Sequence, residues 1–186
     1  MSNLLKTFAV IFATAGIMCM ASANDAPKAV PGAEMYVYSI TDLKKPTSDA
    51  DPLAVVVDKS EDFSKGNLRR NSETSKFRNQ SVFIVWKGYI AIPQRGVYTF
   101  ALSYNDPCRS YDDVFFQING KDFLDICLLP KSKYNDSRSL LLDKGHYEIK
   151  IINRCPNSHD FSIKMWNKAR PLKKAKITPA IMVHAE

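Results

Sequence analysis

The stretch from Phe83 to Gly120 constrains the fold more than any other part of this 186-residue chain. It reads FIVWKGYIAIPQRGVYTFALSYNDPCRSYDDVFFQING. Apolar and polar residues alternate in its three apolar runs, which is the period of a half-buried β-strand. Pro-Gln-Arg-Gly between the first two runs is a β-turn signal, and Asn119-Gly120 is the strongest two-residue signal for a hairpin. The stretch therefore predicts antiparallel strands joined by tight turns.

The same alternation continues through the rest of the chain, and no segment shows a sustained helical period. About eight to ten short strands separated by turn signals are typical of an all-β sandwich or barrel. We therefore expect a single all-β domain, an antiparallel β-sandwich. Besides the runs in the opening stretch, we expect strands over 35–40, 53–57, 122–128, 139–142, 146–153, 161–165 and 177–183.

Three features qualify this prediction. Gly88 is expected to interrupt the strand that begins near Val82. Residues 58–80 show no apolar period, so we expect an irregular segment with a short helix around 69–76. A segment of that length inside a compact domain is either functional or mobile. Residues 130–137 are polar and are expected to form a loop.

A short motif occurs twice in the chain. Gly96-Val97-Tyr98 and Gly145-His146-Tyr147 each place a turn glycine before an alternating strand, with tyrosine two residues after the glycine. The repetition predicts that the two strands occupy matching places in the sandwich and run the same way.

The first 23 residues have the pattern of a signal peptide. Lys6 precedes the apolar run 8–20, and Ala21-Ser22-Ala23 is a cleavage site of the A-x-A kind. The run is too short to span a bilayer, which takes about 20 residues. Because Met18 rather than a small residue precedes Cys19, we expect release and not lipidation. The expectation is export to the periplasm, cell surface or medium, with a flexible leader at 24–32, the domain at 33–186 and no later transmembrane segment.

The chain is basic. Its formal net charge of +7 becomes 7 − 1 = +6 when Lys6 is removed with the leader. Six of the cations crowd the segment from Lys164 to Lys176. A basic surface favours polyanions, but Trp166 is the one aromatic residue in this run, so we expect a solvated tail. Export argues against nucleic acid as a partner.

No catalytic signature is found, and we expect a protein that is not an enzyme. His146, His159 and His184 are scattered, and the sequence holds no Gly-x-Ser-x-Gly, phosphate loop or His-Glu-x-x-His motif. Trp86 and Trp166 are expected in the core because both lie in or beside alternating strands. The better candidates for stacking on a sugar ring are loop tyrosines, namely Tyr104, Tyr111 and Tyr134.

The motifs together resemble the PA14 domain family. The resemblance rests on FIVWKGYIAIPQRGVYTF, DDVFFQINGKDF, LLLDKGHYEIKI and DFSIKMWN, which occur in the family's order within roughly residues 32–180. It implies a jelly-roll-like β-sandwich of the kind found in secreted toxins, glycosidases and adhesins, where it is often a carbohydrate-binding module.

The resemblance also implies a site. PA14-type lectins bind sugar through calcium, which is held by two consecutive aspartates joined by a cis peptide and by an asparagine from a neighbouring loop. The matching pair here is Asp112-Asp113, and Asn153 and Asn157 come from the second loop. Two departures from the family are Val114, where many members have glycine, and the inserted segment 106–111. The implied metal ligands are Asp112, Asp113 and Asn153, and the implied sugar-binding residues are Tyr104, Tyr111, Asp112, Asp113 and Asn157.

Three cysteines remain after removal of the leader: Cys108, Cys127 and Cys155. An exported chain is expected to form one disulfide and leave one thiol. Cys108 and Cys155 follow the glycines of the repeated motif by twelve and ten residues, so we expect Cys108–Cys155, with Cys127 buried and free. Cys108–Cys127 is the open alternative.

The function expected from these features is an exported, non-catalytic binding module for a glycan or cell-surface polysaccharide, with possible help from calcium. The alternative is a structural or assembly subunit that binds a protein partner in a periplasmic or cell-surface complex. A small hydrolase is the third option.

Overall fold

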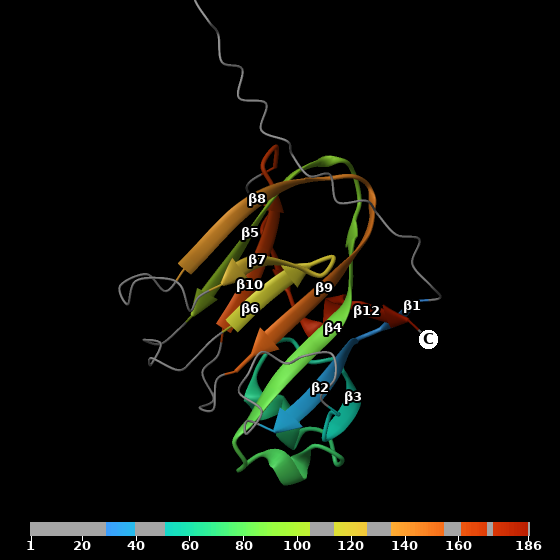
Figure 1. The fold of residues 1–186 in the computed structure, drawn as a ribbon. Coiled ribbons are helices and arrows are strands. Elements are labelled where there is room, and N and C mark those ends of the chain that lie inside the picture. The colour runs from blue at the N-terminus through green and yellow to red at the C-terminus, as the bar shows by residue number, and fades with distance from the viewer. Residues whose placement is uncertain are drawn as a thin grey trace, which may run out of the picture.

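The computed structural model describes residues 29–39, 51–104, 114–125, 135–154, 161–170 and 173–185. These residues form two antiparallel sheets that lie face to face (Figure 1). The strands are β1 (Ala29–Pro31), β2 (Ala33–Ser39), β3 (Ala54–Asp58), β4 (Val82–Ile92), β5 (Gly96–Tyr104), β6 (Val114–Ile118), β7 (Lys121–Asp125), β8 (Asn135–Leu142), β9 (Gly145–Asn153), β10 (Phe161–Asn167), β11 (Ala175–Ile177) and β12 (Val183–Ala185). Three short 3-10 helices complete the described elements: η2 (Lys65–Arg69), η3 (Ser75–Phe77) and η4 (Pro179–Ile181).

The larger sheet has eight strands and the smaller sheet has four. The larger sheet runs β1-β12-β4-β9-β6-β7, with β2 pairing β4 and β3 pairing β2; the smaller sheet runs β11-β10-β5-β8. From β4 onward the chain passes repeatedly between the sheets. Strands β5, β8 and β10 belong to the smaller sheet, and each comes directly after a strand of the larger sheet. The predicted antiparallel β-sandwich is confirmed.

One hydrophobic core lies between the sheets. Phe100 of β5 and Phe116 of β6 come from opposite sheets, and their ring centroids are 5.5 Å apart. The predicted inward faces of β5 and β9 are confirmed, because alternate residues of both strands are buried. These residues are Tyr98, Phe100 and Leu102 in β5, and Tyr147, Ile149 and Ile151 in β9.

Gly88 does not interrupt β4, and that expectation is wrong. The strand runs through it for eleven residues. A Cβ atom at position 88 would lie 2.8 Å from the carbonyl oxygen of Val183 and 3.1 Å from Cε of Met182. Glycine is needed here because β12 and the residue before it approach the backbone of β4 closely.

The Asn119-Gly120 hairpin is confirmed. It joins β6 to β7, with φ of 48° at Asn119 and 72° at Gly120. These left-handed values are those that a type I′ turn requires. The backbone N–H of Glu148 donates to Oδ1 of Asn119 over 3.0 Å, which also fixes the turn against β9.

The repeated Gly-x-Tyr motif has one structural role in both places. The hydroxyl of Tyr98 donates to the carbonyl oxygen of Gln94 over 3.0 Å, and that of Tyr147 donates to the carbonyl oxygen of Asp143 over 3.2 Å. Each tyrosine therefore bonds to the backbone four residues earlier and fixes the turn that precedes its strand. The prediction that β5 and β9 occupy matching places is supported by this shared geometry.

The segment 58–80 closes the edge of the core. The predicted helix around 69–76 is replaced by the two 3-10 helices η2 and η3. Phe63, Leu68 and Phe77 are buried, and the ring of Phe63 stacks on that of Phe161 at 5.7 Å. The isolated apolar residues of this irregular segment therefore belong to the core, and the segment is ordered by them.

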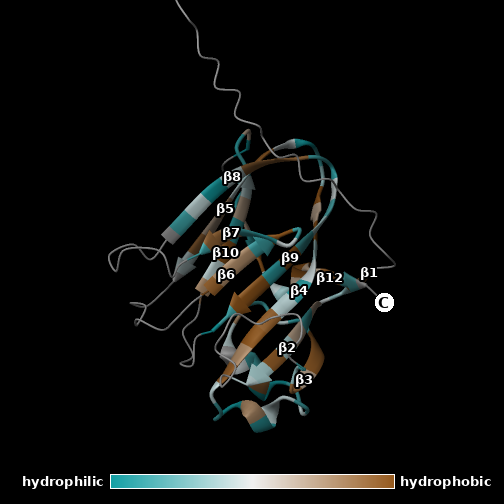
Figure 2. Cartoon of the chain, in the orientation of Figure 1, coloured by the Kyte–Doolittle hydropathy of each residue, from teal (hydrophilic) through white to brown (hydrophobic). Residues whose placement is uncertain are grey.

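Two further expectations differ from the structure. Strand β8 begins at Asn135, so residues 135–137 are paired with β5 and not part of a loop. The expected strand over 177–183 is divided by η4 into β11, at the edge of the smaller sheet, and β12, which lies between β1 and β4. Figure 2 shows the N-terminal half of β8 as hydrophilic, which explains why its sequence resembles a loop.

Within the described residues, no helix is long and apolar enough to cross a membrane.

Candidate functional site

Three connections begin and end at one end of the sandwich. Tyr104, the last residue of β5, lies opposite Phe161, the first residue of β10. Val114, the first residue of β6, lies opposite Asn153, the last residue of β9. Asp125 at the end of β7 lies opposite Phe115, and Asn135 at the start of β8 lies opposite Ser103. We call this the loop end; it is at the left of Figure 1.

The register confirms that β5 and β9 run toward the same end, as the repeated motif predicted. The chain leaves β5 at residue 104 and returns at 114, next to the point where β9 ends. The segments that carry Asp112, Asp113 and Asn157 are therefore anchored side by side, although these residues lie outside the described part of the chain.

Two of the predicted site residues lie within described strands. Asn153 is the last residue of β9 and is 3% exposed. Alternate residues of a strand point to the same face, and Tyr147, Ile149 and Ile151 point inward. Asn153 continues this series, so it lies at the loop end of the core. Tyr104 belongs to β5 and not to a loop. The others lie outside the described residues: Cys108, Tyr111, Asp112, Asp113, Cys127, Tyr134, Cys155 and Asn157. The calcium ligands and the disulfide remain predictions.

Aromatic packing makes the floor of the loop end rigid. Phe161 is 3% exposed, and its ring lies 6.3 Å from the Trp86 ring in an edge-on arrangement. Phe63 packs against both rings. The predicted core position of Trp86 is confirmed, since its side chain has no exposed surface. A rigid floor holds the anchor points of the loops in place, which is a requirement for a preorganised binding site.

No group of three or more His, Cys, Asp or Glu side chains that could hold a metal ion is found in the described residues. Of the three predicted calcium ligands, Asn153 is the one that lies within the described residues. Asparagine oxygen suits calcium.

Asp58 accepts hydrogen bonds from four donors, and no sequence motif marks it as a site residue. It is 5% exposed. One carboxylate oxygen accepts from Nε1 of Trp86 over 2.8 Å and from Nδ2 of Asn67 over 3.1 Å. The other accepts from the backbone N–H of Ser60 over 2.9 Å and from the Ser60 hydroxyl. Four donors thus satisfy a buried charge and tie the segment 58–67 to the core.

A surface hollow of about 290 Å³ adjoins Asp58. Its lining includes Ser60, Asn67, Arg70 and Asn71. The Oδ1 atom of Asn67 is buried and has no hydrogen-bond partner among the described residues. The hollow has polar groups, but the Asp58 oxygens already hold four donors, so the arrangement is mainly structural.

The outer face of the larger sheet carries a second apolar cluster. Phe83, Val85 and Ile152 are buried there beneath Tyr36, Tyr38 and Phe115, outside the main core. The rings of Tyr38 and Phe83 stack at 4.8 Å. Burial, with the hydrogen bond that the Tyr36 hydroxyl donates to Glu34, raises the pKa of Tyr36 to about 12. Burial also raises the pKa of Tyr38.

Two lysines of this outer face lie directly opposite each other, Lys87 on β4 and Lys150 on β9. Burial, together with the charge of Lys87, lowers the pKa of Lys150. The ammonium group of Lys87 lies 4.1 Å from the ring centroid of Tyr36. Glu148 and Asp122 act in the opposite direction on Lys150, so both signs of charge are present on this face.

The basic segment from Lys164 to Lys176 is not a tail. Lys164 belongs to β10 and Lys176 to β11, and both side chains are exposed. Trp166 is half-exposed and not in the core, and Nζ of Lys174 lies 4.9 Å from its ring centroid. The expectations of a tail and of a buried Trp166 are therefore wrong, because the run pairs with β5 and presents alternate residues to solvent.

Comparison with solved structures shows the same fold in several proteins. An anti-sigma factor domain-containing protein superposes with a TM-score of 0.58 at 18% identity, over 89% of this chain and 51% of that chain. The A domain of epithelial adhesin 9 from Candida glabrata, solved with Galβ1-3GlcNAc, gives 0.59 at 9% identity over 90% and 96%. A β-glucosidase from Kluyveromyces marxianus gives 0.53 at 18% identity, over 73% of this chain and 16% of that chain.

This chain thus spans about half of the first of these proteins and a sixth of the glucosidase. A search of curated proteins found no match. The family profile described as PA14 domain matches residues 37–159, which is most of the sandwich. The chain therefore belongs to the PA14 domain family.

Proposed function

We propose that this protein is an exported, lectin-like module that binds carbohydrate at its loop end. Calcium held by Asp112, Asp113 and Asn153 would orient the sugar, with Asn157 as a further ligand-binding residue. Tyr104 and Tyr111 would stack on the ring. Carboxylate and amide oxygens are the ligands that calcium takes in proteins.

The observation that carries this proposal is the convergence of the strands at the loop end. Asn153 lies opposite Val114, the residue that follows Asp113 in the chain. Strand pairing thus puts the start of β6 and the end of β9 next to each other at one end of the same sheet, which supports a site there. Membership of the PA14 family and the likeness to an adhesin domain solved with Galβ1-3GlcNAc support a glycan as the ligand.

A glycan array that includes Galβ1-3GlcNAc tests the proposal. Binding is expected in the presence of calcium, and both EDTA and Asp112→Ala are expected to abolish it. Asp122→Ala is a matched control, because Asp122 is an exposed aspartate on β7 whose carboxylate accepts from Gln117 and not at the loop end. Sugar binding that survives both EDTA and Asp112→Ala would remove calcium from the account, and no binding to any glycan would contradict the proposal.

A second candidate function, an assembly subunit of an envelope complex, is favoured by β3. Among the described strands, β3 pairs with β2 alone and is an edge of the larger sheet. Leu53, Val55 and Val57 in and beside it are 45%, 45% and 43% exposed. A free edge with apolar side chains can accept an extended segment of a partner protein as an added strand.

Purification of the native envelope complex distinguishes the two functions. The assembly role would be favoured by two results together. A protein partner co-purifies in stoichiometric amount and is lost in the Val55→Lys variant, and the array shows no glycan binding. We propose binding and not catalysis in either case. Incubation with a panel of polysaccharides is expected to release no sugar, and hydrolysis of any of them would contradict this part of the proposal.

A further inference from the structure

The outer face of the four-stranded sheet contains no acidic residue at the described outward positions. Because Phe100, Leu102 and Ile163 are buried in the core, the residues between them in β5 and β10 point outward. The register places small and hydroxyl-bearing residues side by side on this face. The outward residues are Val97, Thr99, Ala101 and Ser103 on β5, Ser137, Ser139 and Leu141 on β8, Ser162, Lys164 and Trp166 on β10, and Lys176 on β11.

Positive charge is concentrated along one side of this face. Residues 161–178 contain six Lys and Arg residues and no Asp or Glu. Lys164 lies directly opposite Lys176 across the β10–β11 pair, and both are exposed. Lys174 follows the same side of β11 and lies over the ring of Trp166. We call Lys164, Lys174, Lys176 and Trp166 the cationic face.

Neutral groups, not carboxylates, hold these lysines in place. Nζ of Lys176 donates to the backbone carbonyl oxygen of Glu61 over 2.8 Å, and Nζ of Lys174 lies 4.9 Å from the Trp166 centroid. The ion pairs of Arg95 with Asp143 and of Arg138 with Asp136 lie elsewhere. The ammonium groups of Lys174 and Lys176 are thus positioned by neutral groups.

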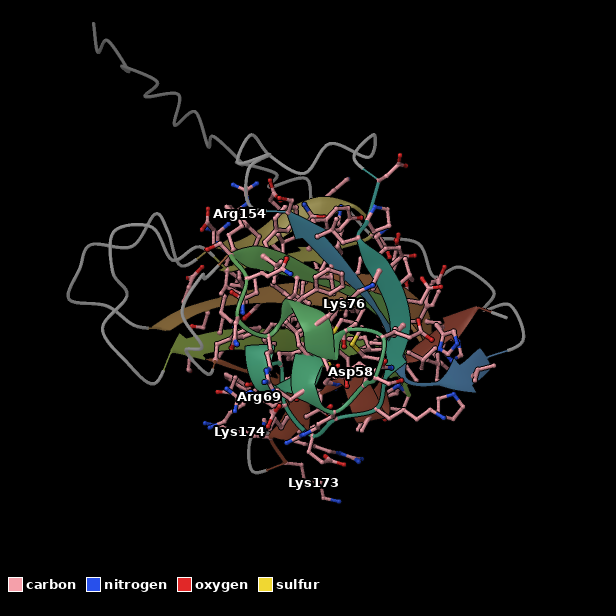
Figure 3. The ribbon with its side chains drawn as sticks, turned by 90° about the horizontal axis from the view of Figure 1, so that it is seen from below. Asp58, Arg69, Lys76, Arg154, Lys173 and Lys174 are labelled. Carbon is pink, nitrogen blue, oxygen red and sulfur yellow. The ribbon has the colours of Figure 1, made fainter. Side chains whose placement is uncertain are left out.

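Like charges directly opposite on neighbouring strands destabilise a sheet. Lys164 and Lys176 are such a pair, with strands about 4.8 Å apart. A bound anion would relieve this repulsion. Figure 3 shows Arg69, Lys173 and Lys174 in the lower half of the view, whereas Arg154 lies in its upper half.

The shape of the face distinguishes among polyanions. Single-stranded nucleic acid is usually held by several aromatic side chains that stack on successive bases, and Trp166 is the one aromatic residue at the described outward positions of this face. Interfacial membrane binding uses a broad apolar surface, and the exposed large apolar residues Leu53, Val55, Val57 and Ile181 belong to other elements. A hydroxyl-bearing surface with lysines on one side suits a polymer that carries carboxylates and hydroxyls on its rings.

We infer that the cationic face binds an acidic polysaccharide, whose carboxylates pair with Lys164, Lys174 and Lys176 while a ring contacts Trp166. The serine hydroxyls of β5 and β8 would accept and donate hydrogen bonds to ring hydroxyls. This surface lies on a sheet face, uses no residue of the loop end, and does not depend on the proposed calcium site.

Titration calorimetry with polygalacturonate oligomers tests the inference, with dextran oligomers of equal length as the uncharged control. The dissociation constant of the double variant Lys164→Gln/Lys174→Gln is expected to rise about tenfold, as the loss of two charge contacts predicts. Lys176 is left unchanged because it also holds the Glu61 carbonyl oxygen. The matched control is Lys59→Gln/Lys144→Gln, which removes the same charge from two exposed lysines outside the face.

We expect the control variant to bind within about twofold of the wild type, and a weaker salt dependence for Lys164→Gln/Lys174→Gln. If polygalacturonate binding weakens equally in both variants, the effect comes from the net charge of the protein and the inference is overturned. Equal binding of dextran and polygalacturonate would overturn it as well. Tighter binding to phosphatidylglycerol vesicles or to single-stranded DNA, lost in the same variant, would assign the face to a different polyanion.

Discussion

The outer faces of the two sheets differ in what covers them. The larger sheet carries Phe83, Val85 and Ile152 at 2%, 1% and 5% exposure, covered by Tyr36, Tyr38 and Phe115. The smaller sheet carries serine, threonine, alanine and lysine in the equivalent positions. A sandwich needs one apolar face per sheet, so the second apolar layer is not required by the architecture. We conclude that one outer face adds stability, whereas the other is free to bind.

The two outer faces also differ in whether their lysines have acidic residues beside them. Lys87 and Lys150 on the larger sheet have Glu34, Glu148 and Asp122 on the same face. Lys164 and Lys176 on the smaller sheet have no acid beside them at the described outward positions. The larger sheet thus balances its lysine pair internally, while the smaller sheet leaves its pair for an external partner.

The largest expected difference comes from removing one aromatic residue from each face. Phe83→Ala should lower the free energy of unfolding by about 3 to 4 kcal/mol, because a buried ring leaves a cavity. Trp166→Ala should lower it by less, about 1 to 2 kcal/mol, since the side chain is only half-buried. Urea unfolding of both variants measures this, and equal losses would refute the division of roles.

A smaller effect is expected from the hydroxyl pair on the smaller sheet. Thr99 Oγ1 and Ser139 Oγ are 2.9 Å apart. A double-mutant cycle with Thr99→Val and Ser139→Ala should give a coupling energy of about 0.5 to 1 kcal/mol. Coupling well above that range would show that this face also serves stability, and would weaken the contrast with Phe83.

The last effect concerns Tyr36 and is a loss of stability that begins only at alkaline pH. Its pKa is raised to about 12 from an ordinary value of 10.0, so the folded protein keeps a proton that the unfolded chain releases. This contribution to stability is complete below pH 10 and is lost as the pH rises toward 12. Urea midpoints measured at several pH values between 9 and 12 should fall less steeply in Tyr36→Phe than in the wild type. Parallel slopes would show that this tyrosine is not held by burial and Glu34.

Much of the fold could be predicted from local pattern. Alternation identified the inward faces of β5 and β9, and Asn119-Gly120 identified its hairpin, because both signals lie within a few residues. Gly88 was misjudged because the reason for glycine lies in Met182 and Val183, which are distant in sequence. The first residues of β8 have low strand propensity and are extended by their pairing with β5.

The candidate sites were predicted less completely, for a physical reason. The Gly-x-Tyr repeat predicted that β5 and β9 end together, and the register bears this out at Asn153. The basic run resembles a tail in the sequence because charge alone does not reveal strand pairing. Lys164 faces Lys176 only once β10 and β11 form a ladder, and Lys174 reaches Trp166 through the same ladder. The four donors on Asp58 likewise come from residues up to 28 positions away.

A crossed binding experiment tests the central claim that the loop end and the cationic face are separate binding surfaces. Galβ1-3GlcNAc and polygalacturonate are titrated into the wild type, Asp112→Ala and Lys164→Gln/Lys174→Gln, with and without EDTA. We predict that Asp112→Ala and EDTA abolish binding of the neutral glycan and leave polygalacturonate within about twofold, while the lysine variant weakens polygalacturonate about tenfold and spares the neutral glycan. Loss of both ligands in either variant would contradict the claim and indicate one shared surface.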